Sequence, residues 1–189
     1  AFSRSSFMYT LLLSDALIIL VQKSLLAFEE LGRSGASRGA LFATGAHLFG
    51  CGMALANHAN ESTIDRWGHR LAAGTAVGGL ALSEPSGGSD LANATTTFTK
   101  APNGYVLNGS KAFVTNGLVA DVLIVSAIDP ENPAAMGTTT FVVSAKTQGL
   151  RTEGIGTGTG LRGTAMAKIH LDKCVVSKAD VLGRIGGGM

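Results

Sequence analysis

The first third of the chain carries apolar residues at the spacing of an α-helix. A helix is predicted from Ser14 or Asp15, either of which can cap it, to about Leu31. Its apolar face repeats about every 3.6 residues, at Leu17, Leu20, Val21, Leu25 and Phe28. Two further helices are predicted over residues 36–59, which are rich in Ala, Gly and Leu, and over residues 62–72.

From about Gly74 onwards, the pattern changes to short apolar alternations among Thr, Val, Gly and Ser. Such alternation is typical of strands, and Asn103-Gly104 is a strong hairpin signal because both residues tolerate positive φ. Many short strands separated by turns indicate a small barrel or sandwich. The chain is therefore predicted to be α+β, with an N-terminal α-helical domain at residues 1–73 and a β domain at residues 74–189. The predicted strands are residues 96–100, 105–108, 112–115, 121–127, 138–144, 165–171 and 174–176.

Composition narrows the class of protein. Of the 189 residues, 46% are hydrophobic and 15% are charged, which is typical of a globular chain. A net charge of +2 without a basic run gives no support to nucleic-acid binding. Ser14-Asp15 interrupts the apolar run near the N-terminus, so neither a membrane span nor a signal peptide is predicted, and a cytoplasmic protein is expected. Cys51 and Cys174 lack metal-type spacing and are expected to be buried free thiols.

Two stretches carry candidate chemistry. In Leu80–Asp90, LALSEPSGGSD, proline ends an apolar strand, and the following glycines allow the backbone to approach a ligand closely. Such a loop suits the binding of a flat or phosphorylated group, although this stretch alone favours an ordinary turn. In Asn108–Gly117, NGSKAFVTNG, a turn is predicted before and after a short strand that carries Phe113 to Thr115.

Together, these stretches resemble the middle domain of the acyl-CoA dehydrogenase family. The family carries T/S-E-P-x-A/G-G-S-D followed by N-G-x-K-x-W/F-I/V-T-N, and both match here in order and spacing. The resemblance continues at Gly160–Gly163 and Val181–Gly183 and covers roughly Ser14–Met189. It implies N-terminal helices, a β-barrel middle domain and a C-terminal four-helix bundle. The sequence stops at Gly186–Met189, where the bundle would begin.

The resemblance implies FAD-dependent α,β-dehydrogenation of an acyl thioester carried by CoA or by an acyl carrier protein. A base removes the α-proton, and the β-hydride goes to N5 of FAD. The family's base is a Glu of the C-terminal bundle, so it is expected outside this chain, and no catalytic residue is assigned. The residues implied to bind FAD are Leu80, Leu82, Ser83, Gly88, Ser89, Phe113, Val114 and Thr115.

The resemblance also implies a role for each position in the first stretch. Leu82 and Ser83 would give backbone and hydroxyl contacts to the pyrimidine edge of the flavin. Gly88 and Ser89 would reach the pyrophosphate region, and Ser89 would also lie near the pantetheine arm of the substrate. Leu80 replaces an aromatic residue that is common in the family, which removes a stacking or hydroxyl contact.

In the second stretch, Phe113 would take the place of the family's Trp or Phe against the flavin. Thr115 would direct its hydroxyl towards N5, and Val114 would supply a backbone contact. Glu84 lies in the first motif, but the family's Glu there is structural, so Glu84 is not expected to be the base. No metal site is predicted, because no Cys, Asp or further His stands at ligand spacing from the histidines, which are His47, His58, His69 and His170.

Two alternatives stay open at this point. A chain with the flavin signature but without the base could be a non-catalytic flavin-binding or scaffold subunit of a hetero-oligomer. The second alternative is a related acyl-CoA oxidase or flavin monooxygenase on the same fold. The motifs do not exclude it, because oxygen reactivity depends on access to the pocket. By resemblance, a dimer or tetramer is expected, with an electron-transfer flavoprotein as electron acceptor.

Overall fold

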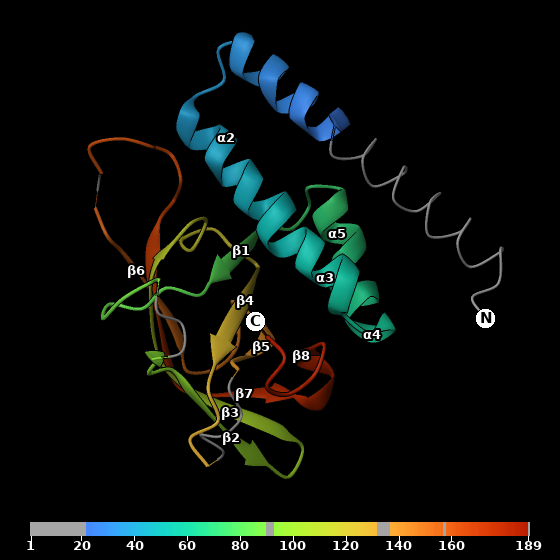
Figure 1. The fold of residues 1–189 in the computed structure, drawn as a ribbon, viewed down its shortest axis with the longest axis vertical. Coiled ribbons are helices and arrows are strands. Elements are labelled where there is room, and N and C mark those ends of the chain that lie inside the picture. Colours follow the sequence, from blue (N-terminus) through green and yellow to red (C-terminus); the bar gives the residue numbers. More distant parts are fainter. Residues whose placement is uncertain (1–21, 90–92, 132–136, 157, 189) are drawn as a thin grey trace, which may run out of the picture.

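The computed structural model describes residues 22–89, 93–131, 137–156 and 158–188. Residues 22–33 form the described part of the first predicted helix, whose start lies outside the described residues. The second predicted helix is one continuous rod, and the third lies directly after it, so both are confirmed (Figure 1). The rod consists of α2 (Arg38–Gly45), the π-helical η1 (Ala46–Gly52) and α3 (Met53–His58), and the third helix of α4 (Glu61–Thr63), the π-helical η2 (Ile64–Gly68) and α5 (His69–Ala72).

The strands of the described residues form two four-stranded sheets. The first sheet has the order β1 (Gly78–Ala81), β4 (Val122–Ala127), β5 (Thr139–Ser144), β8 (Val181–Leu182). The second has the order β2 (Thr97–Ala101), β3 (Gly104–Val114), β7 (Ala167–Ser177), β6 (Leu150–Gly154). The pair β1–β4 is parallel, and every other pair is antiparallel.

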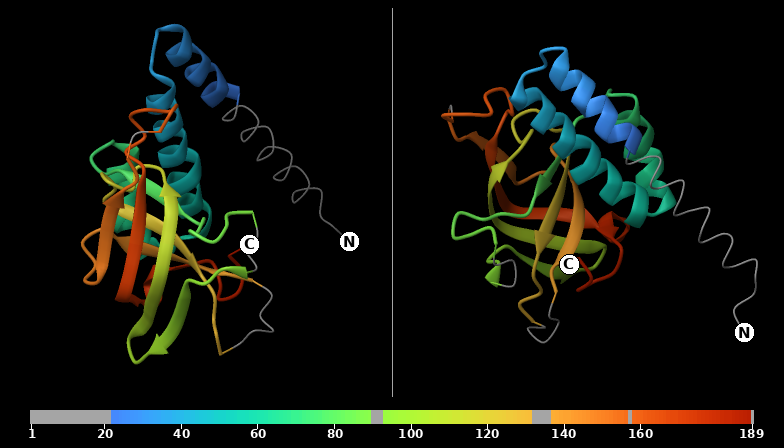
Figure 2. Two further views of the ribbon diagram at one scale, coloured as in Figure 1. Left: turned by 90° about the vertical axis from the view of Figure 1, so that its left-hand side faces the viewer. Right: turned by 45° about the horizontal axis from the view of Figure 1, so that its top comes forward.

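The first sheet is buried on both faces. Along β4, Leu123 and Val125 pack into a core shared with the second sheet, whereas Val122 and Ile124 pack against the helices. This explains why all six residues of β4 are buried. Figure 2 shows the resulting layers, with the helical rod on one side of the first sheet and the second sheet on the other.

The rod is tied to β1 by polar contacts of His47, which lies in the π-helical turn. The Gly78 N–H donates to Nδ1 of His47 at 3.0 Å, so this nitrogen carries no proton, and Nε2 lies 3.2 Å from the Leu71 carbonyl oxygen. Asn116 adds two further bonds, from Nδ2 to the carbonyl oxygens of Ala43 and Gly78. The rod therefore holds the strand that leads into the first candidate stretch.

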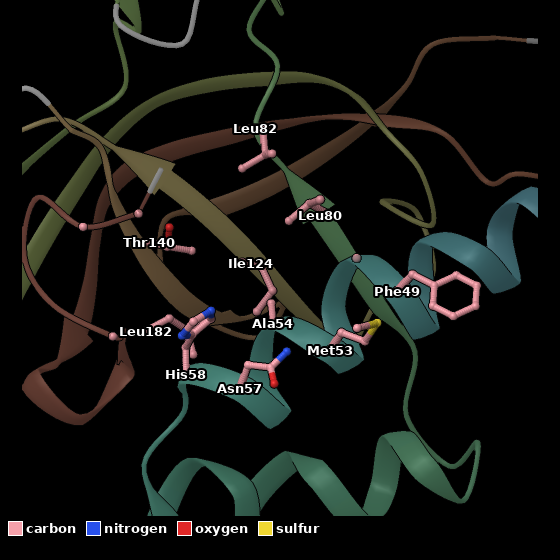
Figure 3. A pocket seen from close by; sticks show the side chains of 14 residues that line it. Phe49, Met53, Ala54, Asn57, His58, Leu80, Leu82, Ile124, Thr140 and Leu182 are labelled. Atoms are coloured by element: carbon pink, nitrogen blue, oxygen red, sulfur yellow. The ribbon is translucent and has the colours of Figure 1, made fainter. Parts of the chain in front are cut away.

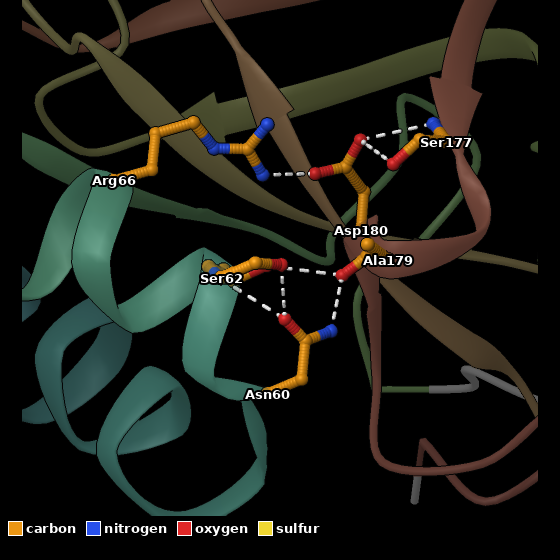
Figure 4. A network of polar contacts seen from close by, with 7 residues as sticks. Asn60, Ser62, Arg66, Ser177, Ala179 and Asp180 are labelled. Carbon is orange, nitrogen blue, oxygen red and sulfur yellow. Dashed lines mark hydrogen bonds and ion pairs between the residues drawn. The ribbon is translucent and has the colours of Figure 1, made fainter.

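A second polar network joins the helices to the turn η4 (Lys178–Asp180) before β8 (Figure 4). Asn60 caps α4 and donates from Nδ2 to the Ala179 carbonyl oxygen at 2.6 Å. Arg66 forms an ion pair with Asp180, whose carboxylate also accepts from the N–H and hydroxyl of Ser177. These contacts clamp the end of β7 against the helices.

The strand predictions needed correction at glycine-containing turns. The turn predicted at Asn108-Gly109 is wrong, because β3 runs straight through these residues. Gly109 has φ +144 at a shift of register, and a Cβ there would lie 2.7 Å from Cα of Thr96. Similarly, β7 is one strand that continues through Lys173 at φ +52. Strands β6 and β8 were not predicted.

Two other expectations bear on the fold. Cys51 and Cys174 are free and buried, and burial raises the pKa of Cys51 to about 12. Among the described residues, one helix, Arg38–His58, is long and apolar enough to cross a membrane. This is weak evidence for a span, because core helices of globular folds pass the same test. The domain boundary at residues 73–74 remains a prediction between the end of α5 and the start of β1.

Candidate functional site

The first candidate stretch leaves β1 and folds into a tight loop. The N–H of Glu84 donates to the Gly87 carbonyl oxygen at 2.9 Å, and the N–H of Gly87 donates back at 3.1 Å. Pro85 and Ser86 form the exposed tip. Gly88 then passes over Ser83, because a Cβ on Gly88 would lie 2.9 Å from the Ser83 hydroxyl. A larger residue at position 88 would require the Ser83 side chain to move.

Glu84 fixes the base of the loop. Its side chain is almost fully buried and accepts hydrogen bonds from the Thr95 N–H and hydroxyl, the Thr96 N–H and Lys111 Nζ. Burial alone would raise the pKa of Glu84, but these hydrogen bonds outweigh burial and lower it from 4.5 to about 2. With both oxygens occupied and a low pKa, Glu84 is a structural anion, as expected from the sequence.

Lys111 is the partner of Glu84 and lies in the middle of β3. Its side chain has no exposed surface, and Nζ donates to the carboxylate of Glu84 at 2.9 Å and to the Ser126 hydroxyl at 3.1 Å. The third bond goes to the Leu82 carbonyl oxygen at 3.0 Å. Burial lowers the pKa of Lys111, and the Glu84 carboxylate opposes that shift. The sequence motif contains this lysine, but the sequence analysis assigned it no role.

The structure brings the two candidate stretches together. The N–H of Ala112 donates to the Ser83 carbonyl oxygen at 2.8 Å. A Cβ on Gly79 would lie 3.0 Å from the carbonyl oxygen of Thr115, so β1 and the end of β3 are in close contact there. The Leu80–Ser83 edge therefore lies beside the end of β3.

The end of β3 has an unusual backbone. Phe113 has φ +55 and Asn116 has φ +65, both in the left-handed region that non-glycine residues seldom adopt. Phe113 is 66% exposed, a large value for an aromatic side chain, whereas Thr115 is 7% exposed. The Thr115 hydroxyl forms no hydrogen bond with a described residue and keeps some solvent contact. Strained residues held by the surrounding structure are common at binding sites.

A cavity of about 310 Å³ lies between the rod and the first sheet (Figure 3). Its wall includes Leu80 and Leu82 from the β1 segment and Phe49 and Met53 from the rod, and polar side chains stand at one end. Those polar residues, none of which was a predicted binding residue, are Asn57, His58 and Thr140.

Phe113 lines a different cavity, of about 700 Å³, whose wall is rich in glycine from residues 154–156 and 158–163. Leu80 and Phe113 thus line different cavities. The wall of the larger cavity also includes Leu118, Leu161, Arg162 and Met166.

The remaining predicted site residues occupy different environments. Val114 is buried in the core between the sheets, so only its backbone is available for a ligand. Gly88 and Ser89 are exposed, and a Cβ on Gly87 would meet no atom within 4 Å. The loop therefore has room for a group beside it. No described contact joins Ser89 to the end of β3.

A second group of polar side chains lies on the outer face of the second sheet. The Ser110 hydroxyl is 3.2 Å from Nδ1 of His170, and Nε2 of His170 is 3.1 Å from a carboxylate oxygen of Glu153. The order matches a nucleophile, a base and an orienting carboxylate. However, the group lines neither cavity described above, and Glu153 is exposed beside Arg151. It is a cross-strand surface network.

The candidate flavin residues fit a flat, hydrogen-bonding ring with a phosphorylated arm. The hydroxyls of Ser83 and Thr115 have no hydrogen-bond partner among the described residues, and Phe113 offers an exposed aromatic face. The Gly87 N–H already donates to Glu84, whereas Gly88 is exposed, so its backbone is accessible to phosphate oxygens. The described residues contain no group of three His, Cys, Asp or Glu that could hold a metal ion.

Comparison with known proteins gives matches over most of this chain. Residues 79–174 match the model of the acyl-CoA dehydrogenase middle domain. The mitochondrial isovaleryl-CoA dehydrogenase of Pongo abelii is 34% identical over 166 residues, which cover 87% of this chain and 39% of that protein. The L-prolyl-[peptidyl-carrier protein] dehydrogenase of Pseudomonas fluorescens is 30% identical over 164 residues, covering 86% of this chain and 43% of that protein.

The fold is shared as well. The solved structure of PigA with FAD and proline superposes with a TM-score of 0.80 at 29% identity, covering 85% of this chain and 42% of PigA. This chain thus spans about two fifths of the length of the proteins it resembles. The matched middle-domain model covers just over half of its residues, including both motifs and the strands β1 to β6. The chain therefore belongs to the acyl-CoA dehydrogenase family.

Proposed function

We propose that this chain supplies the helical and middle-domain parts of a FAD-dependent dehydrogenase of acyl thioesters. The observation that carries the proposal is the junction of the Leu80–Ser83 edge with the end of β3. This junction brings the segment that carries Ser83 close to the segment that carries Thr115, and the hydroxyls of both residues lack a partner among the described residues. The names of the relatives, which include dehydrogenases of acyl-CoA and of a carrier-bound acyl group, support the same reaction class.

Each residue has a definite task in this proposal. Ser83 and Thr115 donate hydrogen bonds to the edge of the flavin, and Phe113 covers part of its face. Gly88 and Ser89 give backbone N–H groups and a hydroxyl to the pyrophosphate. Bound FAD supplies the acceptor for the hydride that leaves the β-carbon of the acyl group.

The catalytic base is proposed to lie outside this chain. Glu84 cannot serve, because Lys111 and the two threonines already occupy its oxygens. Neither cavity has an Asp or Glu among the described residues of its wall. In the proposed reaction, a carboxylate base from outside this chain removes the α-proton.

The acyl carrier, the assembly and the location are part of the proposal. CoA and a carrier protein present the same pantetheine, and the relatives include one enzyme for each. A homo- or hetero-oligomer, an electron-transfer flavoprotein as acceptor and a cytoplasmic location are proposed as expected from the sequence. The free cysteines support a reducing compartment.

The experiment is anaerobic titration of the FAD-loaded native protein, purified together with the part or partner that supplies the base, with isovaleryl-CoA and, separately, with a prolyl-loaded carrier protein. Bleaching of the flavin absorbance by either thioester supports the dehydrogenase. FAD that binds but is not bleached by any thioester supports the non-catalytic flavin-binding subunit instead. Rapid oxygen consumption after air is admitted supports an oxidase.

The placement of FAD is tested by substitution at the end of β3. Thr115→Val removes the hydroxyl at nearly constant volume, and Phe113→Ala removes the exposed ring. We expect both variants to shift the visible spectrum of bound flavin, because each changes its immediate environment. Val175→Ala, on the exposed face of β7, is the control. Unchanged spectra in both variants would show that the flavin does not lie at β3.

A further inference from the structure

Lys111 makes contacts that a buried ion pair alone does not need. An ammonium group has three N–H donors, and here they go to Glu84, Ser126 and the carbonyl oxygen of Leu82. Ser126 belongs to β4, Leu82 follows β1, and Lys111 itself belongs to β3. One side chain with no exposed surface thus connects both sheets and the loop at the candidate flavin site.

This connection orients the Leu82–Ser83 segment. The Leu82 carbonyl oxygen accepts from Nζ of Lys111 at 3.0 Å, and the Ser83 carbonyl oxygen accepts from the N–H of the next residue, Ala112, at 2.8 Å. Two successive carbonyl groups are therefore held by two successive residues of β3. The Ser83 hydroxyl is left without a partner among the described residues.

The same strand ends at the other half of the site. Phe113 and Thr115 follow Lys111 by two and four residues, and the kinked backbone places Thr115 beside Gly79 of β1. The separation between the Ser83 and Thr115 hydroxyls therefore depends on how firmly the loop is attached to β3. Lys111 supplies the side-chain part of that attachment.

We propose that Lys111 is a positioning residue of the flavin site, which sets the Leu82–Ser83 edge relative to the Phe113–Thr115 edge. This inference rests on the proposed function. Lys111 does not touch the cofactor in this proposal, but acts through the Leu82 carbonyl group. If Lys111 were only half of a stabilising ion pair, replacing both charged side chains by neutral ones should cost the protein little stability and leave the flavin site unchanged. Replacement would still release the Leu82 carbonyl.

The test uses three variants: Lys111→Met, the double variant Glu84→Gln/Lys111→Met, and the conservative Lys111→Arg. The double variant removes both buried charges and is expected to recover most of the melting temperature lost in Lys111→Met. Its FAD affinity is expected to stay about ten- to a hundredfold below wild type, the loss that corresponds to one hydrogen bond from a charged donor. Lys111→Arg keeps the donor and should recover part of the affinity.

A matched control lies on the outer face of the same sheet. Glu153 and Lys168 are directly opposite each other on β6 and β7. The double variant Glu153→Gln/Lys168→Met therefore removes the same two kinds of charge without touching the loop. We expect its FAD affinity and flavin spectrum to equal those of wild type.

Amide hydrogen exchange, measured without FAD, separates this inference from the proposed function. We expect residues 83–88 to exchange faster in Glu84→Gln/Lys111→Met than in wild type and in the outer-face control, even where melting temperatures agree. Unchanged exchange at residues 83–88, or full FAD affinity in the double variant, overturns the positioning role. A wild-type protein that binds no FAD overturns the flavin proposal, whatever the exchange result.

Discussion

Two neighbouring residues of β3, Ser110 and Lys111, belong to similar carboxylate networks that differ in burial. Ser110 faces the outer side of the second sheet and joins a network in which His170 contacts the carboxylate of Glu153. Lys111, the next residue, faces the interior and contacts the carboxylate of Glu84. Each network pairs one carboxylate with one nitrogen-containing side chain, but the first network lies in solvent and the second in the core.

The difference lies in what surrounds each carboxylate. Glu84 is 4% exposed, and four donors saturate its oxygens, so its position is determined by the fold. The Glu153 side chain is 48% exposed and shares its oxygen with His170 and Arg151, so water can replace either partner. Only the buried network can transmit a position to the candidate flavin site, because exposed pairs contribute little to stability or geometry.

The most direct test of the difference between the two networks is to remove each carboxylate in turn. Glu84→Ala leaves the Lys111 ammonium buried without its anion. It also removes the hydrogen-bond acceptor of the Thr95 and Thr96 donors. We expect a loss of about 3–5 kcal/mol in the free energy of unfolding, the usual cost of an unpaired buried charge. Urea unfolding followed by circular dichroism measures it.

Glu153→Ala is the matched substitution on the outer face and should leave the urea midpoint close to that of wild type. Equal losses in the two variants would contradict the distinction between the networks. A small loss in Glu84→Ala would mean that water enters the core and hydrates Lys111.

The sequence predicted the elements with strong periodicity. The helices at residues 36–59 and 62–72 and the strands now named β4 and β5 lie where expected, because each combines a clear apolar pattern with a definite end. The predictions failed where a glycine or lysine adopts positive φ inside a strand. Gly109 marks a bulge rather than a turn, because β7 continues to pair with β3 on both sides of it.

The candidate site was predicted by motif and only partly by physical pattern. Glu84 was expected to be structural, and its bonds to Thr95 and Lys111 explain why. The role of Lys111 could not be predicted, because its partners are distant in sequence: Leu82 follows β1, and Ser126 belongs to β4 of the other sheet. His47 was missed for a similar reason. A lone histidine in an apolar helix gives no sign that strand β1 will meet it.

Acid titration should show a smaller effect of the buried carboxylate on stability than its removal does. The pKa of Glu84 is lowered from 4.5 to about 2, so its stabilising contribution is complete above pH 4.5 and is lost as the pH falls towards 2. Between about pH 5 and about pH 3, wild type should lose about 2 kcal/mol from this group. Glu84→Gln should lack that part of the slope. Identical slopes in the two proteins would show that Glu84 titrates normally.

The smallest effect is expected at the outer network. The hydrogen bond from His170 lowers the pKa of Glu153, helped by nearby Lys168 and Arg151, so this contribution is also lost on acidification. Because Glu153 is exposed, salt screens these charges, whereas the buried pair is screened much less. Glu153→Gln should therefore change the melting temperature slightly in low salt and not at all in 1 M salt. For Glu84→Gln, the loss should be the same at both salt concentrations. If the loss of melting temperature in Glu84→Gln depended on salt, the Glu84–Lys111 pair would be in contact with solvent. It could then not hold the loop more firmly than an exposed pair does.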